Sequence, residues 1–517
     1  MKQYEMYELV FQGEEPQGSQ VAVDVNAIFS CNGEEKIVKG FYAGDGIYKI
    51  RFYPMKEGEY SWKVTGEVQL YGTLEGTEMC KKEIESGKGM VRAVGTHFEY
   101  DSGGYYYPFG TTVYALAHQE NNLIEETFQT LSTAPFNKVR HCVFPKHYDY
   151  NNNEPQFYPF EKNEDGKWDV NHPCFAFWEH LEEIIRKMGI YGIQSDLILF
   201  HPYDNWGFAE LSREENLIYL DYVIRRFSAI PEIWWSLSNE FDLCYHKNME
   251  DWYAFETFVA ENDSFGHLLS NHNCFSFYDF KRPTITHCSM QSNQMMRASQ
   301  WIEEYGKPIV YDEVCYEGNL PQNWGNISGF ELTNRFWIAC VQGAYVTHGE
   351  VFLSEDDILW WSKGGNLKGQ SSSRIAFLRS IIEEIGAPLE TWETNPLEGM
   401  DEEMIQKILN SPLALLPGQM PLDQQEAHLF TDAAYRGHVG EQIFIQYLGI
   451  HCNAMLDWSL PETGKYDIEI IDVWEMTRKK VMYNVSGKIR VNLPGKEGIA
   501  VLAKRVEDKK GIENELL

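Results

Sequence analysis

The sequence predicts an α/β protein in which a (β/α)8 barrel is flanked by an N-terminal β-sandwich and a small C-terminal all-β domain. In the middle of the chain, short apolar segments of strand length alternate with helical segments, a pattern typical of parallel sheets. Before and after this region, closely spaced strand patterns follow one another without helices between them. We place the three domains at residues 1–93, 94–390 and 391–517.

The N-terminal region consists of short strand patterns separated by turns. Residues 47–54 (IYKIRFYP) alternate between apolar and polar side chains, and residues 21–31 alternate in part. The turn signals GDG at 44–46 and KEGE at 56–59 come next to these segments, and another strand pattern follows at 59–66. Short strands at such spacing are typical of a β-sandwich.

The middle region contains eight strand candidates with helical patterns between them. The helical pattern at 177–189 places Leu181, Ile184, Ile185 and Met188 on one face, and another helix is expected at 215–228. Eight strands with intervening helices fit the size of a (β/α)8 barrel. The fifth candidate is the weakest, which leaves a doubly wound sheet as the alternative. The candidates are 105–116, 137–145, 192–200, 232–242, 267–273, 284–289, 308–316 and 343–350.

The last region returns to strand patterns after a polar, Pro-containing passage. It predicts an all-β module without an internal repeat. The expected strands are 428–434, 442–449, 466–474, 487–494 and 498–505.

Charge and composition exclude some classes of partner. The chain has 44 Lys and Arg against 77 Asp and Glu, a net charge of −33. Such a surface repels nucleic acid and anionic membranes. Aromatic residues make up 14% of the chain, which suits either sugar binding or an ordinary core. We therefore expect neither a nucleic-acid nor a membrane partner.

The N-terminus shows no secretory signal, and no apolar run reaches the roughly 18 residues that span a bilayer. The ten cysteines include no CxxC pair. Scattered cysteines in a long chain of this kind are typical of reduced thiols. The sequence therefore predicts a cytoplasmic protein.

Two of the predicted barrel strands end in a carboxylate. IWWSLSNE ends at Glu240 and PIVYDE ends at Glu313. An acid directly after a buried strand is costly unless it is paired or solvated in a cleft. Two carboxylates that converge at a barrel mouth are what glycoside hydrolysis needs, and Asn239 could hold a sugar 2-hydroxyl. The alternative is that both acids are solvated or salt-bridged groups that cap strand ends.

Other polar and aromatic residues lie at or after the expected strand ends, where barrel enzymes place their functional groups. Each of them could equally be a packed or salt-bridged structural residue. We expect some of them to contact a sugar substrate. They are Arg140, His141, His201, Trp206, His287, His348, Trp360 and Trp361.

The segments SLSNEF (236–241) and VYDEV (310–314) resemble the acid/base and nucleophile strands of clan A glycoside hydrolases. The whole chain resembles the family 5-like and apiosidase-like bacterial hydrolases, which join a β-sandwich, a barrel and a small β-domain. The resemblance implies a retaining mechanism, with Glu240 as general acid/base and Glu313 as nucleophile. It implies that Asn239 binds the 2-hydroxyl and that Arg140 supports the nucleophile, and His287 lies on strand 6, where relatives place a residue that touches the nucleophile or the substrate.

These observations predict a retaining hydrolase of an oligosaccharide or small plant-type glycoside, without a cofactor or metal. We expect a raised pKa on Glu240 and an ionised Glu313. The long segment 146–175, rich in Asn, Tyr and Phe, is expected to act as a lid or to wall the substrate site. Two alternatives stay open. One is a metal-dependent hydrolase, although no HxH or HExxH motif occurs; the other is a carbohydrate-binding protein with an inactive barrel.

Overall fold

In a computed structural model of the protein, the described residues are 1–83, 87–392, 402–410 and 435–506. They form two compact units. Unit 1 comprises residues 1–292, 305–327 and 346–369, and unit 2 comprises residues 293–304, 328–345 and 370 onward. Among the described residues, no helix combines the length and apolar character that crossing a membrane requires.

The N-terminal part of unit 1 is a sandwich of two four-stranded antiparallel sheets, in the orders β4-β5-β1-β7 and β3-β2-β6-β8. Alternate side chains along β2 are buried, as expected for a strand with one face on a core. Phe29 and Phe52 stack in that core with ring centroids 4.0 Å apart. The strands are β1 (Tyr7–Gly13), β2 (Val25–Cys31), β3 (Glu34–Lys39), β4 (Phe41–Tyr42), β5 (Ile47–Phe52), β6 (Gly58–Gly66), β7 (Leu70–Tyr71) and β8 (Glu75–Cys80).

A buried arginine joins the sandwich to the helices of unit 1. The Arg51 guanidinium donates to Glu8 at 2.7 Å, to Glu182 at 2.6 Å and to the Arg226 carbonyl at 2.5 Å. Arg226 also donates to Glu182, at 3.0 Å. These charge-assisted bonds engage all three nitrogens of a guanidinium that is almost fully buried.

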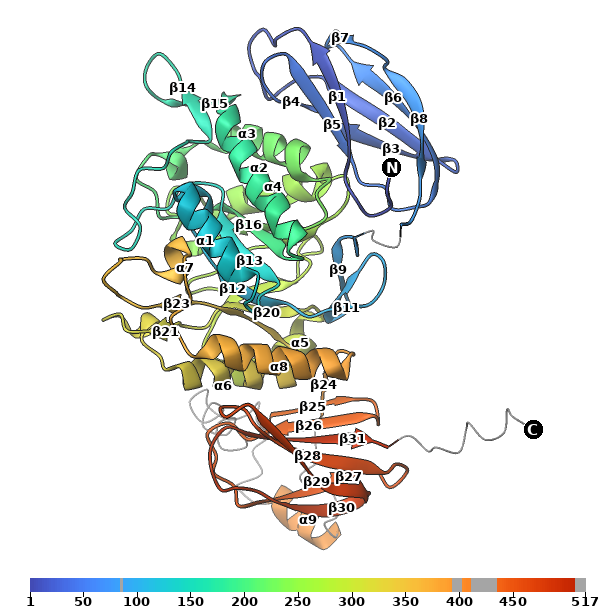
Figure 1. The fold of residues 1–517 in the computed structure, drawn as a ribbon, viewed down its shortest axis with the longest axis vertical. Coiled ribbons are helices and arrows are strands. Elements are labelled where there is room, and N and C mark those ends of the chain that lie inside the picture. The colour runs from blue at the N-terminus through green and yellow to red at the C-terminus, as the bar shows by residue number, and fades with distance from the viewer. Residues whose placement is uncertain (84–86, 393–401, 411–434, 507–517) are drawn as a thin grey trace, which may run out of the picture. The chain divides into compact units, whose positions relative to one another are not determined.

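The centre of unit 1 is an eight-stranded parallel sheet that curls into a nearly closed barrel, in the order β18-β17-β16-β13-β12-β22-β20-β19. Its strands β12, β13, β16 and β20 are labelled at the centre of the unit in Figure 1. The Thr286 N–H donates to the Leu269 carbonyl at 2.9 Å, which links the two ends of the sheet. The strands are β12 (Phe109–Thr112), β13 (Lys138–Cys142), β16 (Gln194–Phe200), β17 (Ile233–Ser238), β18 (Leu268–Ser270), β19 (Cys288–Gln291), β20 (Ile309–Glu313) and β22 (Tyr345–His348).

Amphipathic helices and short strand pairs complete unit 1. The helix α2 buries Leu181, Ile184, Ile185 and Met188, the face that the sequence predicts. A small sheet β11-β10-β9 precedes the barrel, and β14 pairs with β15 inside the segment 146–175. The elements are α1 (Asn121–Leu131), α2 (Phe175–Ile190), α3 (Arg213–Phe227), α4 (Met249–Asn262), α7 (Trp360–Lys363), β9 (Val91–Val94), β10 (His97–Tyr100), β11 (Tyr105–Tyr106), β14 (Phe160–Lys162), β15 (Trp168–Pro173), β21 (Glu317–Gly318) and β23 (Glu350–Val351).

Unit 2 combines helices of the barrel region with the C-terminal strands. A six-stranded sheet, β24-β25-β26-β31-β28-β29, lies beside the pair β27-β30, and the Tyr447 hydroxyl donates to Asn334 of α6 at 2.9 Å. The elements are α5 (Ala298–Tyr305), α6 (Gly329–Val341), α8 (Ser371–Ile385), α9 (Glu402–Leu409), β24 (Glu390–Thr391), β25 (Tyr435–Val439), β26 (Ile443–Tyr447), β27 (Met455–Leu460), β28 (Tyr466–Asp472), β29 (Thr477–Val485), β30 (Gly487–Asn492) and β31 (Ile499–Arg505).

The predicted fold class is confirmed, and the doubly wound alternative is wrong because the strand order curls round into a barrel. The weak candidate at 267–273 contains β18. The sixth strand was predicted at 284–289 but runs from Cys288 to Gln291, so its expected start is four residues too early. The C-terminal strand expected at 428–434 lies outside the described residues.

Candidate active site

Glu240 comes two residues after the end of β17, in a strained backbone conformation. Its φ is +53°, in the left-handed region that non-glycine residues rarely adopt. The Asn239 N–H donates to the Phe200 carbonyl at 2.9 Å, and the Glu240 N–H donates to His272 Nδ1 at 3.3 Å. These bonds hold the chain to the ends of the neighbouring strands. Such strain persists where surrounding structure fixes it, and it is common at active sites.

The Glu240 carboxylate is surrounded by donors. Its Oε2 accepts hydrogen bonds from the Tyr203 hydroxyl and, at 3.2 Å, from Asn239 Nδ2. The amide of Gln291, in the orientation that satisfies its neighbours, donates to Oε1 at 3.2 Å. These three hydrogen bonds orient the carboxylate. Glu240 is 6% exposed, so it remains within reach of solvent.

Glu313 is the last residue of β20 and is linked to Glu240 by hydrogen bonds of two intervening side chains. The Tyr114 hydroxyl bonds to Glu313 Oε1 and to Asn239 Oδ1, the latter at 2.9 Å. Arg140 Nη1 lies 3.9 Å from Glu313 Oε1, and Nη2 donates to Asn239 Oδ1 at 3.4 Å. A chain of contacts therefore runs from Glu313 through Tyr114 and Asn239 to Glu240.

The two glutamates interact electrostatically, and the raised pKa lies on Glu313. Burial raises the pKa of Glu313 to about 7, the charge of Glu240 adds to the rise, and Arg140, Tyr114 and Lys146 oppose it. The expectation that Glu313 stays ionised thus runs against the direction of its pKa, because two close buried carboxylates hold one proton between them, and the expectation for Glu240 stays a prediction.

Beneath the glutamates lies a fully buried cluster of charges. Lys138 Nζ donates to Asp196 and to Asp312, both at 2.7 Å. Arg140 Nε lies 3.6 Å from Asp196 and 3.8 Å from Asp312. Although burial alone would raise it, the charges of Lys138 and Arg140 hold the pKa of Asp312 well below its usual range. The cluster fixes Arg140 where its guanidinium faces Glu313.

Four residues that the sequence analysis did not single out as ligands border the glutamates. Tyr114 and Tyr203 contact them directly, Gln291 reaches Glu240, and Lys146 lies over the rings of both tyrosines. Tyr203 comes just after the predicted strand 192–200, so a search of all residues after strand ends would have found it, whereas Tyr114 falls inside the predicted strand 105–116. Lys146 and Gln291 also come just after predicted strands, at 137–145 and 284–289, and the same search would have found them.

Among the residues expected at the site, the structure brings five together: Glu240, Glu313, Asn239, Arg140 and Trp361. The Trp361 ring packs edge-on against Tyr114, with centroids 5.6 Å apart. His201 is linked to the glutamates through Tyr203. Its Nδ1 accepts the Tyr203 N–H at 3.2 Å, and its Nε2 contacts the Phe144 carbonyl. It therefore orients the loop that carries Tyr203.

The structure places the remaining candidates elsewhere, which corrects the expectation that they face the substrate. Successive side chains on a strand point to opposite faces, so His141 faces away from Arg140 and bonds to Ser195. His348 likewise packs on Phe136, 4.6 Å between ring centroids, and bonds to Thr111, as does Trp360.

His287 precedes β19 rather than ending it, so it lies at the opposite end of the strand from the glutamates. Its ring packs on Trp234 at 5.3 Å, and burial lowers its pKa to about 3, as expected for a neutral core histidine. Trp206 is in the loop after β16, where its Nε1 donates to Glu154 at 2.9 Å. The segment 146–175 thus contacts this loop, and its Tyr148 packs against Trp361.

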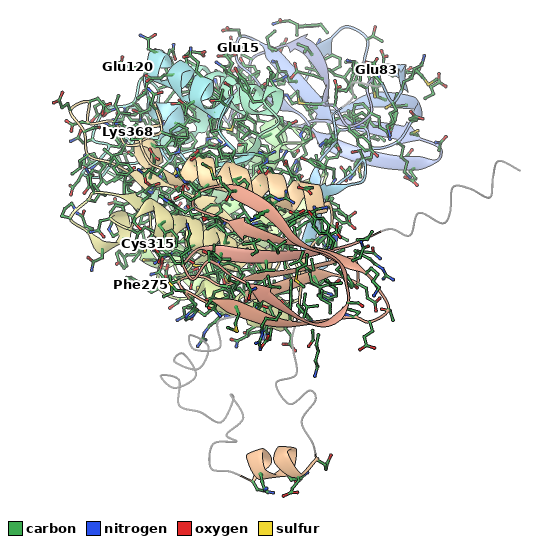
Figure 2. All side chains as sticks on the ribbon, turned by 60° about the horizontal axis from the view of Figure 1, so that its bottom comes forward. Glu15, Glu83, Glu120, Phe275, Cys315 and Lys368 are labelled. Atoms are coloured by element: carbon green, nitrogen blue, oxygen red, sulfur yellow. The ribbon has the colours of Figure 1, made fainter. Side chains whose placement is uncertain are left out.

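A loop fixed by Asp242 carries an exposed aromatic ring one residue after Cys274. The Asp242 carboxylate accepts the backbone N–H groups of Cys274, Phe275 and Ser276 at 2.6, 2.7 and 2.9 Å. The charge of Glu240 adds to the burial that raises the pKa of the Cys274 thiol to about 12, so this thiol is close to Glu240. The next residue, Phe275, is 82% exposed and reaches the surface (Figure 2).

The described residues contain no group of three His, Cys, Asp or Glu side chains that could hold a metal ion. The chemistry that the arrangement offers is that of two coupled carboxylates, one proton and a row of hydrogen-bond donors. Such a pair can protonate a leaving oxygen and attack or stabilise the carbon that it leaves.

Comparison with known families identifies the chain. The family model described as the apiosidase-like catalytic domain matches residues 94–361. A candidate glycoside hydrolase from Bacteroides vulgatus ATCC 8482 is 31% identical, with 98% of this chain and 99% of that chain covered and a TM-score of 0.85. The chain belongs to the apiosidase-like family. It is a glycoside hydrolase, and its substrate is a carbohydrate.

Other comparisons concern the fold and the flanking domains of this apiosidase-like hydrolase. A glycoside hydrolase family 5 protein from Bacteroides vulgatus ATCC 8482 is 13% identical, with a TM-score of 0.59, 82% of this chain and 94% of that chain covered, and shows the same fold. Two families of unknown function, DUF5060 and DUF5605, match residues 1–67 and 432–504. No curated protein matches the chain.

Proposed function

We propose that this apiosidase-like hydrolase cleaves an O-glycosidic bond of an oligosaccharide or small glycoside with retention of configuration. Glu313 is the nucleophile and Glu240 is the general acid/base. The observation that carries this proposal is the chain of contacts Glu240–Asn239–Tyr114–Glu313, which couples two buried carboxylates at the ends of β17 and β20. One shared proton is what the first step requires.

In the first step the proton resides on Glu240 and passes to the glycosidic oxygen as the bond to the anomeric carbon breaks. An ionised Glu313 oxygen forms the new bond to that carbon. The donors that face Glu313, Arg140 and Tyr114, stabilise its ionised form. In the second step Glu240 takes a proton from water, the water oxygen bonds to the anomeric carbon, and Glu313 leaves with the electron pair.

The proposal is tested by a screen of 4-nitrophenyl glycosides, with and without EDTA, followed by NMR of the first anomer released. We expect hydrolysis that is insensitive to EDTA and a product of retained configuration. Glu313→Gln should abolish turnover of every glycoside. Glu240→Gln should lose most activity on alkyl glycosides but retain more on 2,4-dinitrophenyl glycosides, whose leaving group needs no proton.

A matched control is Glu350→Gln. Glu350 is also a buried glutamate just after a barrel strand, but its carboxylate accepts the backbone N–H groups of Lys368 and Gly369. Its variant should remain active. Inversion at the anomeric carbon, or full activity of Glu313→Gln, would contradict the mechanism. EDTA-sensitive hydrolysis would favour a metal enzyme, and sugar binding without hydrolysis would favour an inactive barrel.

A further inference from the structure

A buried lysine lies among four aromatic rings next to the two glutamates. Lys146 is 2% exposed. Its Nζ lies 3.4 Å from the ring centroid of Tyr114 and 4.3 Å from that of Tyr203, and the rings of Tyr148 and Trp361 follow at 5.0 and 5.6 Å. Tyr114 hydrogen-bonds to Glu313 and Tyr203 to Glu240. The Lys146 ammonium therefore contacts the rings of the two tyrosines that bind the carboxylates.

The rings do not satisfy the hydrogen-bonding capacity of Lys146. An ammonium has three N–H donors, and Nζ has no hydrogen-bond acceptor or ion-pair partner within the described part of the chain. A cation over aromatic faces gains up to about 2 kcal/mol, but the rings supply no hydrogen-bond acceptor for the ammonium. Its N–H donors can therefore bind oxygen atoms of a ligand held against the glutamates.

The charges around Lys146 indicate what kind of ligand supplies these oxygens. The buried groups of the site comprise three cations and four carboxylates, so one proton on the glutamate pair makes the set neutral. A neutral ligand keeps this balance, whereas an anionic ligand would add an uncompensated buried charge. The cations are Lys138, Arg140 and Lys146, and the carboxylates are Asp196, Asp312, Glu240 and Glu313.

We propose that Lys146 is a catalytic residue that binds substrate: its ammonium donates hydrogen bonds to hydroxyl oxygens of a neutral sugar held against Glu240 and Glu313. This inference rests on the proposed function. The same charge favours the ionised form of the nucleophile, because it acts against the burial that holds a proton on Glu313. Lys146 thus links recognition of the sugar to the protonation state that the first step needs.

The test uses two substitutions that separate hydrogen bonding from charge. Lys146→Met removes both. The variant should fold, because an apolar side chain then packs among the aromatic rings. Lys146→Gln removes the charge but keeps an N–H donor. The matched control is Lys162→Met, because Lys162 also lies over an aromatic ring, 4.6 Å from the centroid of Trp168, but is exposed.

The measurement is kcat/KM against pH on 4-nitrophenyl glycosides of neutral hexoses and pentoses and of glucuronic and galacturonic acid. We expect Lys146→Met to lower kcat/KM on the neutral glycosides at least tenfold and to move the acidic limb of the profile to higher pH. Lys146→Gln should show the same shift of the limb with a smaller rise in KM. Lys162→Met should match the wild type.

Two results would overturn the inference while leaving the proposed function standing: a Lys146→Met enzyme with the KM and pH profile of the wild type, or a tenfold preference for a uronide that Lys146→Met abolishes. A wild type inactive on every glycoside would instead count against the proposed function. In that case ¹³C NMR titration of the labelled glutamate carboxyls still decides the role of Lys146. A raised carboxyl pKa in Lys146→Met supports the inference, and an unchanged one refutes it.

Discussion

Lys138 is the residue whose removal should destabilise the barrel most sharply. Its Nζ is fully buried and lies 2.7 Å from carboxylate oxygens of both Asp196 and Asp312. At an effective dielectric constant of about 20, each contact is worth about 6 kcal/mol of Coulomb energy, which desolvation of the ions largely offsets. Lys138→Met leaves two buried carboxylates that share only Arg140, at 3.6 and 3.8 Å. We expect a loss of about 3–5 kcal/mol, the usual cost of breaking a buried ion pair.

The assay is native-state hydrogen exchange of the amides of β13 and β16, because exchange reports the stability of the strands that carry the cluster. A compensating variant, Lys138→Met with Asp196→Asn, removes one charge of each sign and should recover at least half of the lost free energy. The reasoning is refuted if the single variant loses less than about 1 kcal/mol. It is equally refuted if the double variant is as unstable as the single one, since charge balance would then not be the cause.

Three further outcomes follow from the contacts of the site. Tyr114→Phe removes a hydroxyl that lowers the pKa of Glu313, so the acidic limb of kcat/KM should move to higher pH and kcat/KM should fall at least tenfold; an unmoved limb would show that the hydroxyl does not act on Glu313. Because the folded-state pKa of Glu313 lies above the usual 4.5, its stabilising effect is complete below pH 4.5 and is lost as pH rises through about 7. The wild type should therefore lose up to about 3 kcal/mol relative to Glu313→Gln between pH 5 and pH 8, measured by urea unfolding at each pH. Phe275→Ala should raise KM about fivefold for substrates with a sugar or aryl leaving group, since covering part of that ring contributes about 1 kcal/mol, whereas Tyr483→Ala, at another exposed aromatic residue, should leave KM unchanged.

The fold and the two glutamates could be predicted from the sequence because both leave local signals. Apolar strands such as those before Glu240 and Glu313 repeat with helices between them, and barrel enzymes carry their functional groups at and just after the ends of such strands. The three-domain division at residues 93 and 390 stays a prediction. The roles assigned to the two glutamates stay predictions as well.

The histidines could not be placed because their positions depend on strand register, which the sequence does not show. Arg140 and His141 are adjacent, yet one faces the glutamates and the other packs behind the sheet. The predicted strand 284–289 starts four residues before β19. His287 was therefore expected near the strand end that carries the glutamates, whereas it lies at the opposite end of the strand. A one-residue slip exchanges the two faces of a strand, so strand-end position alone cannot select ligands.

The buried charge cluster could have been predicted from residue spacing alone, without knowledge of the strand register. Strand β13 (KVRHC) is buried along its whole length and carries Lys138 and Arg140 two residues apart, so both point to the same face and require buried carboxylates opposite them. Asp196 and Asp312, on the buried strands β16 and β20, are these partners. Because Arg140 contacts these acids below and Glu313 above, stability and catalysis share one set of charges. Lys138→Met should therefore draw Arg140 towards the uncompensated acids and raise the pKa of Glu313. An acidic limb of kcat/KM that stays in place in the folded variant would show that the cluster serves stability alone.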